Sequence, residues 1–150
     1  MPDKSTIIRV RREWAQGKAP STLDGNFVRE EMDHIRQGLH GARSTKQAIA
    51  IGLSKARRAG VKLPAPAKGK ASASTRRKAE QDLKAGARSK RSTPSRKRSK
   101  ATVRALKREG RSAASKSALS RQGRAAAKDR TRAQRSASAR KAARTRAENR

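Results

Sequence analysis

The 150-residue sequence contains no cysteine and no tyrosine, and its aromatic side chains are limited to one tryptophan and one phenylalanine. The lack of cysteine excludes disulfide bonds, thiolate metal sites and cysteine nucleophiles. The scarcity of aromatic rings disfavours binding that depends on stacking against unpaired bases. No apolar run approaches the roughly 20 residues that span a bilayer, and the N-terminal segment lacks the apolar stretch of a signal peptide.

Acidic residues are also scarce. The chain has 42 Lys and Arg against 11 Asp and Glu, a net charge of +31, and only 32% of its residues are hydrophobic. Low apolar content with a high net charge leaves too little burial to offset the entropy of folding, so we expect much of the chain to be unfolded when alone. This composition predicts a soluble, cytoplasmic protein whose partner is a polyanion.

Charge and apolar residues are distributed unevenly along the chain. Residues 64–150 hold 29 of the 42 basic residues and 5 of the 11 acidic ones. Their large apolar residues are only Leu83, Val103, Leu106 and Leu119. Pro64 and Pro66 close any preceding helix. We therefore predict a small helical module over residues 1–63 and a tail rich in Lys, Arg, Ala and Ser over residues 64–150.

Local signals within residues 1–63 predict three short helices. Ile7, Val10 and Trp14 form an apolar stripe that stops at Gly17. A second stripe consists of Val28, Met32, Ile35 and Leu39, and it follows Pro20-Ser21-Thr22, where a hydroxyl is expected as the N-cap.

The third helix has the clearest boundaries. Ser44 and Gln47 fit a capping box, and Gly60 fits the C-terminal stop. Ala48, Gly52 and Ala59 lie on its inner side, and their small size would let a neighbouring helix approach closely.

The tail is of low complexity and is predicted to be mostly disordered. Residues 101–108 and 125–146 are expected to become helical only when their charge is neutralised, since Ala and Arg favour helix. Segments 98–110, 111–123 and 124–136 show a partial 13-residue period, and whether the repeat is genuine is left open. The predicted fold class is thus all-α, a small N-terminal three-helix module followed by a long, basic, mostly disordered tail with conditional helices.

Residues suited to catalysis or metal binding are few. His34 and His40 are the only histidines, and Glu30, Glu31 and Asp33 are nearby. Because His34 is expected on a helix and His40 in the following turn, we interpret both as surface or boundary residues and predict no metal site. No catalytic residues, cofactor or small-molecule substrate are expected, so the chain is not predicted to be an enzyme.

The basic residues are predicted to contact nucleic-acid phosphates, because each contact releases condensed counterions. One interpretation of Thr93-Pro94-Ser95-Arg96 is a turn that presents cations to a minor groove. The favoured interpretation is a proline in a flexible segment. The predicted contacts in residues 1–63 are Lys46, Lys55, Arg57 and Arg58. Those in the tail are Arg96, Lys97, Arg98, Lys100, Arg104, Lys107, Arg108, Arg111, Arg121 and Arg124.

One segment goes beyond composition. Phe27-Val28-Arg29-Glu30-Glu31-Met32, His34-Ile35 and Ser44-Thr45-Lys46-Gln47-Ala48-Ile49-Ala50-Ile51-Gly52-Leu53-Ser54 resemble a small bacterial domain of unknown function. Its core reads S-x-K-Q-A-I-A-I-[AG]-L-S, and its members are often labelled as DNA-binding or plasmid-stabilisation proteins. The tail is similar in composition to linker-histone tails and to the basic tails of bacterial histone-like proteins.

These observations favour sequence-independent binding of duplex DNA through phosphates, in the manner of a histone-like protein that coats or condenses DNA. Such a protein would be associated with the nucleoid, or with the nucleus in a eukaryote. Two alternatives stay open. The first is an RNA- or ribosome-associated basic protein. The second is a protein-interaction module, with residues 1–63 binding a protein partner or a second copy while the tail tethers it to nucleic acid. No membrane partner is expected.

Overall fold

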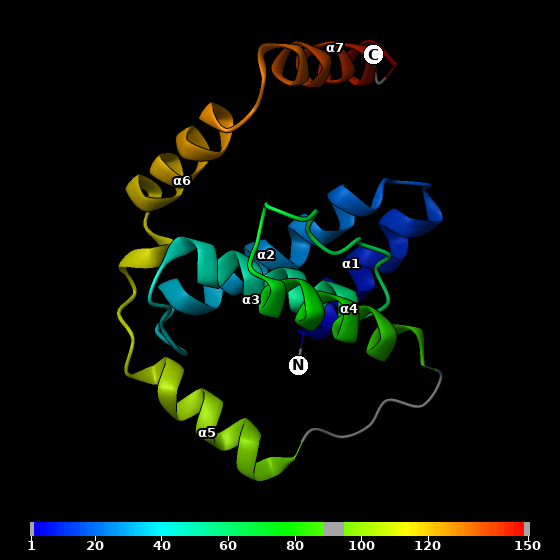
Figure 1. Cartoon of the computed structure of the whole chain (residues 1–150). Helices are drawn as coiled ribbons and strands as arrows, with labels where there is room; N and C mark the ends of the chain where they lie inside the picture. The colour runs from blue at the N-terminus through cyan, green and yellow to red at the C-terminus, as the bar shows by residue number, and fades with distance from the viewer. Residues whose placement is uncertain (1, 89–94, 149–150) are drawn as a thin grey trace. The chain divides into compact units, whose positions relative to one another are not determined.

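The computed structural model describes residues 2–88 and 95–148, and the regular structure in these ranges consists of helices joined by loops, apart from an isolated β-bridge between Lys68 and Ala71 (Figure 1). The chain divides into two compact units, Met1–Ser115 and Lys116–Arg150. The helices of the first unit are α1 (Lys4–Ala15), α2 (Pro20–Arg36), α3 (Thr45–Arg58), α4 (Ala73–Ala87), α5 (Arg96–Lys107) and the short 3₁₀ helix η1 (Ser112–Ala114). The second unit contains α6 (Lys116–Lys128) and α7 (Arg132–Glu148).

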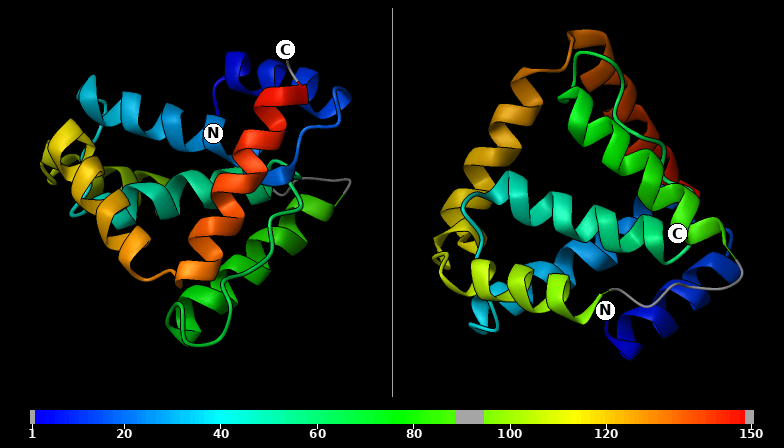
Figure 2. Two further views of the ribbon diagram at one scale, coloured as in Figure 1. Left: turned by 90° about the horizontal axis from the view of Figure 1, so that it is seen from above. Right: turned by 60° about the horizontal axis from the view of Figure 1, so that its bottom comes forward.

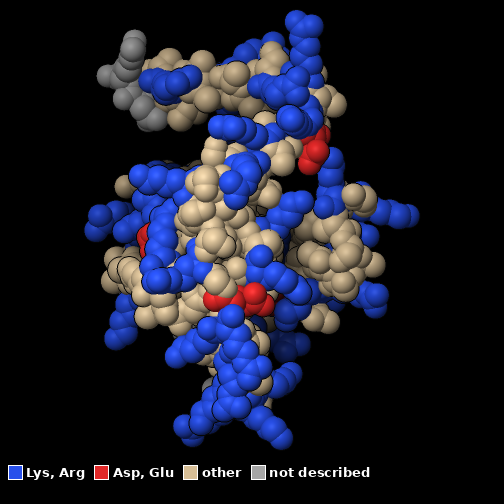
Figure 3. Space-filling view, turned by 90° about the vertical axis from the view of Figure 1, so that its left-hand side faces the viewer, with Lys and Arg blue, Asp and Glu red and all other residues tan. Residues whose placement is uncertain are grey.

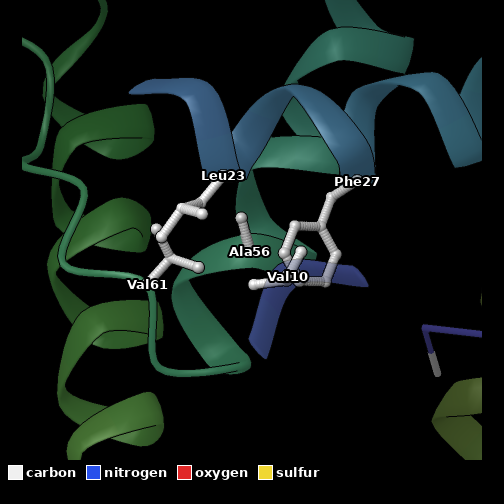
Figure 4. Close-up of a cluster of buried hydrophobic side chains, with 5 residues drawn as sticks. All are labelled: Val10, Leu23, Phe27, Ala56 and Val61. Atoms are coloured by element: carbon white, nitrogen blue, oxygen red, sulfur yellow. The ribbon is translucent and has the colours of Figure 1, made fainter. Parts of the chain in front are cut away.

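The first three helices enclose a small apolar core. Val10 of α1, Leu23 and Phe27 of α2 and Ala56 of α3 are buried together with Val61, which follows α3 (Figure 4). The all-α character of this region and its three helices are therefore confirmed. Leu39, by contrast, lies beyond the end of α2 and is exposed, so the predicted second stripe is one residue too long.

The boundaries of α3 follow local signals, and the start of α2 does not. The Ser44 hydroxyl accepts a hydrogen bond from the Gln47 N–H and begins α3, and Gly60 ends it with φ of +99°. The prediction that a hydroxyl side chain caps the N-terminus of α2 is wrong. Ala19 occupies that position without a side-chain bond, because Pro20 at the first helical position is already set for helix and has no N–H to satisfy.

Helices α2 and α3 approach each other closely at Gly52. A Cβ there would lie 2.8 Å from the Val28 Cα and 3.1 Å from the Phe27 carbonyl oxygen. The backbone of α2 therefore occupies the space of a missing side chain, and the predicted close packing against the small residues of α3 is confirmed.

Helix α4 extends the packed unit beyond residue 63. It crosses α3 (Figure 2), and its Ala79 and Asp82 are buried. At Gly86 a Cβ would collide with the Arg57 carbonyl oxygen, so this glycine permits close contact between α4 and the C-terminal end of α3. Ser72 caps α4 by accepting a hydrogen bond from the Thr75 N–H.

Residues 106–114 dock on the loop between α2 and α3. The Gly41 N–H donates to the Leu106 carbonyl at 2.9 Å, and the Ala42 N–H donates to the Gly110 carbonyl at 3.1 Å. Ala113 and Ala114 are buried there. These contacts use backbone groups and small side chains, so the docking needs little from large apolar side chains, of which the segment has only Leu106.

The prediction of a long disordered tail is therefore wrong, because helices continue to Glu148. Alanine and arginine are intrinsically good helix formers, and Ser and Thr supply caps. At the start of α7, for example, the Gln134 N–H bonds to the Thr131 hydroxyl while the Gln134 side chain accepts from the Thr131 N–H. The number of large apolar residues in residues 64–150 led to too low an expectation of their helical order. That number takes no account of helix propensity, of the caps or of the backbone contacts of residues 106–114.

The 13-residue period does not correspond to a repeated structure, since Ala101 lies in α5, Ala114 in η1 and Ala127 in α6. Thr93 and Pro94 of the expected turn lie outside the described residues. None of the helices in the described ranges combines the length and the apolar content that crossing a bilayer would require.

Candidate nucleic-acid interface

Most of the cations predicted to contact phosphate project into solvent. In the described part of the chain, they make no ion pair with an acidic side chain. The exposed set is Lys46, Arg58, Arg96, Lys97, Arg98, Lys100, Arg104, Lys107, Arg108, Arg111, Arg121 and Arg124. On the face shown in Figure 3, Lys and Arg cover much of the surface, and Asp and Glu appear at only a few points.

Helix α5 carries its cations mainly on one side. Arg96, Lys100, Arg104 and Lys107 follow one another at intervals of four, four and three residues, which places them along one helix face. The helix has no acidic residue, and all of it except Leu106 is exposed. We call these four residues the α5 stripe. Successive members four residues apart are separated by about 6 Å along the helix axis.

The second unit has cations in two arrangements. On α6, Arg121, Arg124 and Lys128 share a face, and Leu119 and Gln122 are half-buried on the other side. On α7 the basic residues are spread around the whole circumference, and every residue of that helix is exposed. Helix α7 therefore presents positive charge in all directions.

Two predicted phosphate contacts, Lys55 and Arg57, have partners inside the first unit. The Arg57 guanidinium is buried and donates to the carbonyl oxygens of Leu63 and Pro64 at 3.1 Å each. Burial lowers its pKa, and the negative charges of Asp82 and Asp24 only partly oppose this. Arg57 therefore ties the segment after α3 to that helix.

Lys55 lies between two carboxylates of α2. Its Nζ is 2.7 Å from Glu31 Oε2 and 3.2 Å from Glu30 Oε1. Burial alone would lower the pKa of Lys55, but the hydrogen bonds and charges of Glu31 and Glu30 outweigh it and raise the pKa. The sequence carried a signal for this pairing, because Glu31 stands four residues after Phe27 and four before Ile35, on the buried face of α2.

The same acidic pair is the centre of a larger polar cluster. His40 Nε2 lies 3.4 Å from Glu31 Oε1, and His34 Nε2 lies 3.0 Å from Asp3 Oδ2. The Asp3 N–H donates to Glu30 Oε2 at 3.1 Å. We call Asp3, Glu30, Glu31, His34, His40 and Lys55 the polar cluster.

The histidines come closer together than their places in the sequence suggested. Their ring centroids are 6.2 Å apart, with the rings nearly perpendicular. Two sets of ligand atoms have spacings that could hold a metal ion, Glu31 with His34 and His40, and Asp3 with Glu30 and His34. Sequence reasoning missed this arrangement because His40 is brought to α2 by the turn at Gly38, whose φ is +79°.

The comparisons with known proteins cover only part of the chain. Residues 21–68 match a family described as a family of unknown function (DUF6496). The match includes α2 and α3 and leaves out α1 and the cationic helices α5–α7. No curated protein and no solved structure matches the chain. The resemblance to a small domain of unknown function is confirmed over these residues, and the DNA-binding label remains a proposal.

Proposed function

We propose that the chain binds duplex DNA through phosphate contacts, without reading base sequence, and coats the duplex. The observation that carries this proposal is the α5 stripe, a row of exposed cations on a helix without acidic residues. The exposed cations of α6 and α7 add further contacts. A net charge of +31 supplies the long-range attraction to a polyanion.

The available side chains favour phosphate contact over base recognition. Lys and Arg on phosphates fix position but carry no sequence information. Of the two aromatic rings, Phe27 is fully buried, and Trp14 on α1 is 49% exposed. A single exposed ring offers little stacking for unpaired bases, so we expect a duplex to be bound more tightly than a single strand. In the first unit, Lys46 and Arg58 remain as supporting contacts, whereas Lys55 and Arg57 have internal partners.

A salt titration of affinity for two unrelated duplexes tests the proposal. Each neutralised phosphate contributes a slope of about −0.9 in log affinity against log salt. Replacing the α5 stripe together, Arg96→Gln, Lys100→Gln, Arg104→Gln and Lys107→Gln, should make the slope shallower by roughly three to four. The loss should be equal on both duplexes, because phosphates are the same in every sequence.

Two control variants separate the stripe from net charge. Exchanging Arg and Lys at the same four positions keeps the charge and should leave the slope nearly unchanged. Neutralising four exposed cations of α1 with glutamine removes the same charge elsewhere, and it should cost much less than the stripe variant; these cations are Lys4, Arg9, Arg11 and Arg12. Equal losses from both neutralised variants would contradict a local interface.

Competition with structured RNA at equal phosphate tests the choice of partner. We expect duplex DNA to displace RNA more readily than RNA displaces DNA. A preference for RNA would move the function to an RNA-associated protein, and a preference above roughly a thousandfold between the two duplexes would indicate a sequence-reading regulator.

A further inference from the structure

We propose that Glu31, His34 and His40 form a binding site for a divalent first-row transition metal ion. Each residue offers one ligand atom, and these three atoms lie within 4.8 Å of one another. Glu31 and His34 come from α2, and His40 comes from the loop that follows it. His40 lines a hollow together with Lys107 and Arg111, two of the cations proposed to contact phosphate, but the metal proposal does not depend on DNA binding.

The contacts of His40 suit a metal ligand. Its Nδ1 lies 3.1 Å from the Gly41 carbonyl oxygen, which can only accept, so Nδ1 carries the proton. The other ring nitrogen, Nε2, faces Glu31 Oε1. A metal ion between the two atoms would take both as ligands. A histidine whose other ring nitrogen donates to a backbone carbonyl is the usual arrangement for a metal ligand.

The separation of these two atoms fits a shared ion. A hydrogen bond between a charged imidazole and a carboxylate is about 2.7–2.9 Å long. Two ligands that each lie about 2.1 Å from a tetrahedral ion are roughly 3.4 Å apart, and His40 Nε2 lies 3.4 Å from Glu31 Oε1.

Glu31 itself lacks enough partners. Its side chain is 0% exposed, and Lys55 contacts only Oε2. Apart from the contacts with Lys55 and His40, its two oxygens have no hydrogen-bond partner among the described residues. A buried carboxylate oxygen without a donor is costly, and a metal ion on Oε1 would remove that cost.

The charges of the side chains in the polar cluster favour a divalent metal ion. Asp3, Glu30 and Glu31 are three carboxylates, and Lys55 is the one ammonium among them. The three carboxylates and the ammonium together carry a net charge of −2, which a divalent ion cancels. This excess of negative charge is a local reversal in a strongly basic chain.

The ligand types select the class of metal. Two imidazoles and one carboxylate suit zinc and its neighbours, whereas magnesium and calcium prefer oxygen ligands alone. Three protein ligands leave one position of a tetrahedral ion for water or for a carboxylate such as that of Asp3.

Titration of the full chain, prepared without a histidine tag, with Co²⁺ and Zn²⁺ tests the site. Because the chain has no cysteine and only two histidines, visible absorption typical of tetrahedral, nitrogen-ligated cobalt can arise only from His34 and His40. We expect one equivalent of Co²⁺ to give this absorption, Zn²⁺ to displace it, and Mg²⁺ in large excess to leave it unchanged.

The variants His34→Asn and His40→Asn should each abolish the cobalt absorption and weaken Zn²⁺ binding at least tenfold. Both side chains are at the edge of the core, and circular dichroism without metal checks that the variants fold. Asp33→Asn is the matched control, because Asp33 pairs with Arg36 at the surface and should bind Co²⁺ normally. Absence of the cobalt absorption in the unchanged chain, or its persistence in both histidine variants, would overturn the proposal.

Discussion

The Ser54 hydroxyl donates a 2.6 Å hydrogen bond to Asp82 Oδ2 and joins α3 to α4. Asp82 is buried, and its other oxygen lies 3.4 Å from Lys78 Nζ. The bond between Ser54 and Asp82 therefore holds α4, the first helix after Pro64 and Pro66, in the packed unit formed by α1–α3.

Replacing Asp82 by alanine should lower the free energy of unfolding by about 1–3 kcal/mol, because the Ser54 hydroxyl loses its acceptor inside the protein. Urea denaturation measures this change. Glu80→Ala is the control, since Glu80 is an exposed acid on the same helix and its loss should stay within about 0.5 kcal/mol. Equal effects of the two variants would mean that α4 is not held by the Ser54–Asp82 bond.

Two glycines inside helices should respond oppositely to alanine. Gly86→Ala places a methyl group against the Arg57 carbonyl and should destabilise the fold by roughly 1–3 kcal/mol. Gly25→Ala meets no atom within 4 Å in α2, so it should stabilise by up to about 1 kcal/mol through helix propensity alone. Thermal unfolding of both variants gives the comparison, and a stabilised Gly86→Ala would show that α4 does not pack closely on α3.

Lys55→Met should destabilise the fold by about 3–5 kcal/mol, because it leaves the carboxylates of Glu30 and Glu31 buried without their cation. Lys46→Met on the exposed side of α3 removes the same charge and should change stability by less than about 0.5 kcal/mol. Denaturant midpoints of the two variants are the measurement. Similar midpoints would indicate that the Lys55 ammonium is solvated.

Asp24→Asn should stabilise the protein at neutral pH. Burial raises the pKa of Asp24, although the Gly25 N–H and the charge of Arg57 work against it. Because the pKa of Asp24 is higher in the folded protein than its unfolded value of about 3.9, protonation of Asp24 favours the folded state at a pH below 3.9. This contribution to stability is lost as the pH rises through the folded-state pKa. The asparagine variant, which stays neutral, should therefore gain stability relative to the unchanged chain between about pH 3 and pH 7.

The gain should be less than about 1 kcal/mol, because Asp24 is partly exposed and solvent screens its charge. Unfolding free energies of both proteins across this pH range supply the test, and Asp33→Asn at the surface serves as the reference. If Asp24→Asn instead lost stability at neutral pH, the attraction between Asp24 and Arg57 would outweigh the burial of the carboxylate.

The positions of α1–α3 could be predicted from the sequence because their signals are local. A serine cap at Ser44 and a glycine stop at Gly60 act on residues within one turn, and they determine the ends of α3 without reference to the rest of the chain. The excess of basic residues is likewise a property of composition, and it alone is the basis for predicting a polyanionic partner.

The tertiary structure decided which basic side chains are exposed to solvent and which are paired inside the protein. Three basic residues lie within four positions of α3, Lys55, Arg57 and Arg58, yet only Arg58 is exposed. The partners of the other two come from α2 and from residues 63–64. The meeting of His34 with His40 and the docking of residues 106–114 depend in the same way on a turn and on backbone groups. Every residue except proline has both of those backbone groups, so their pairing leaves no pattern in the sequence, and only the fold brings them together.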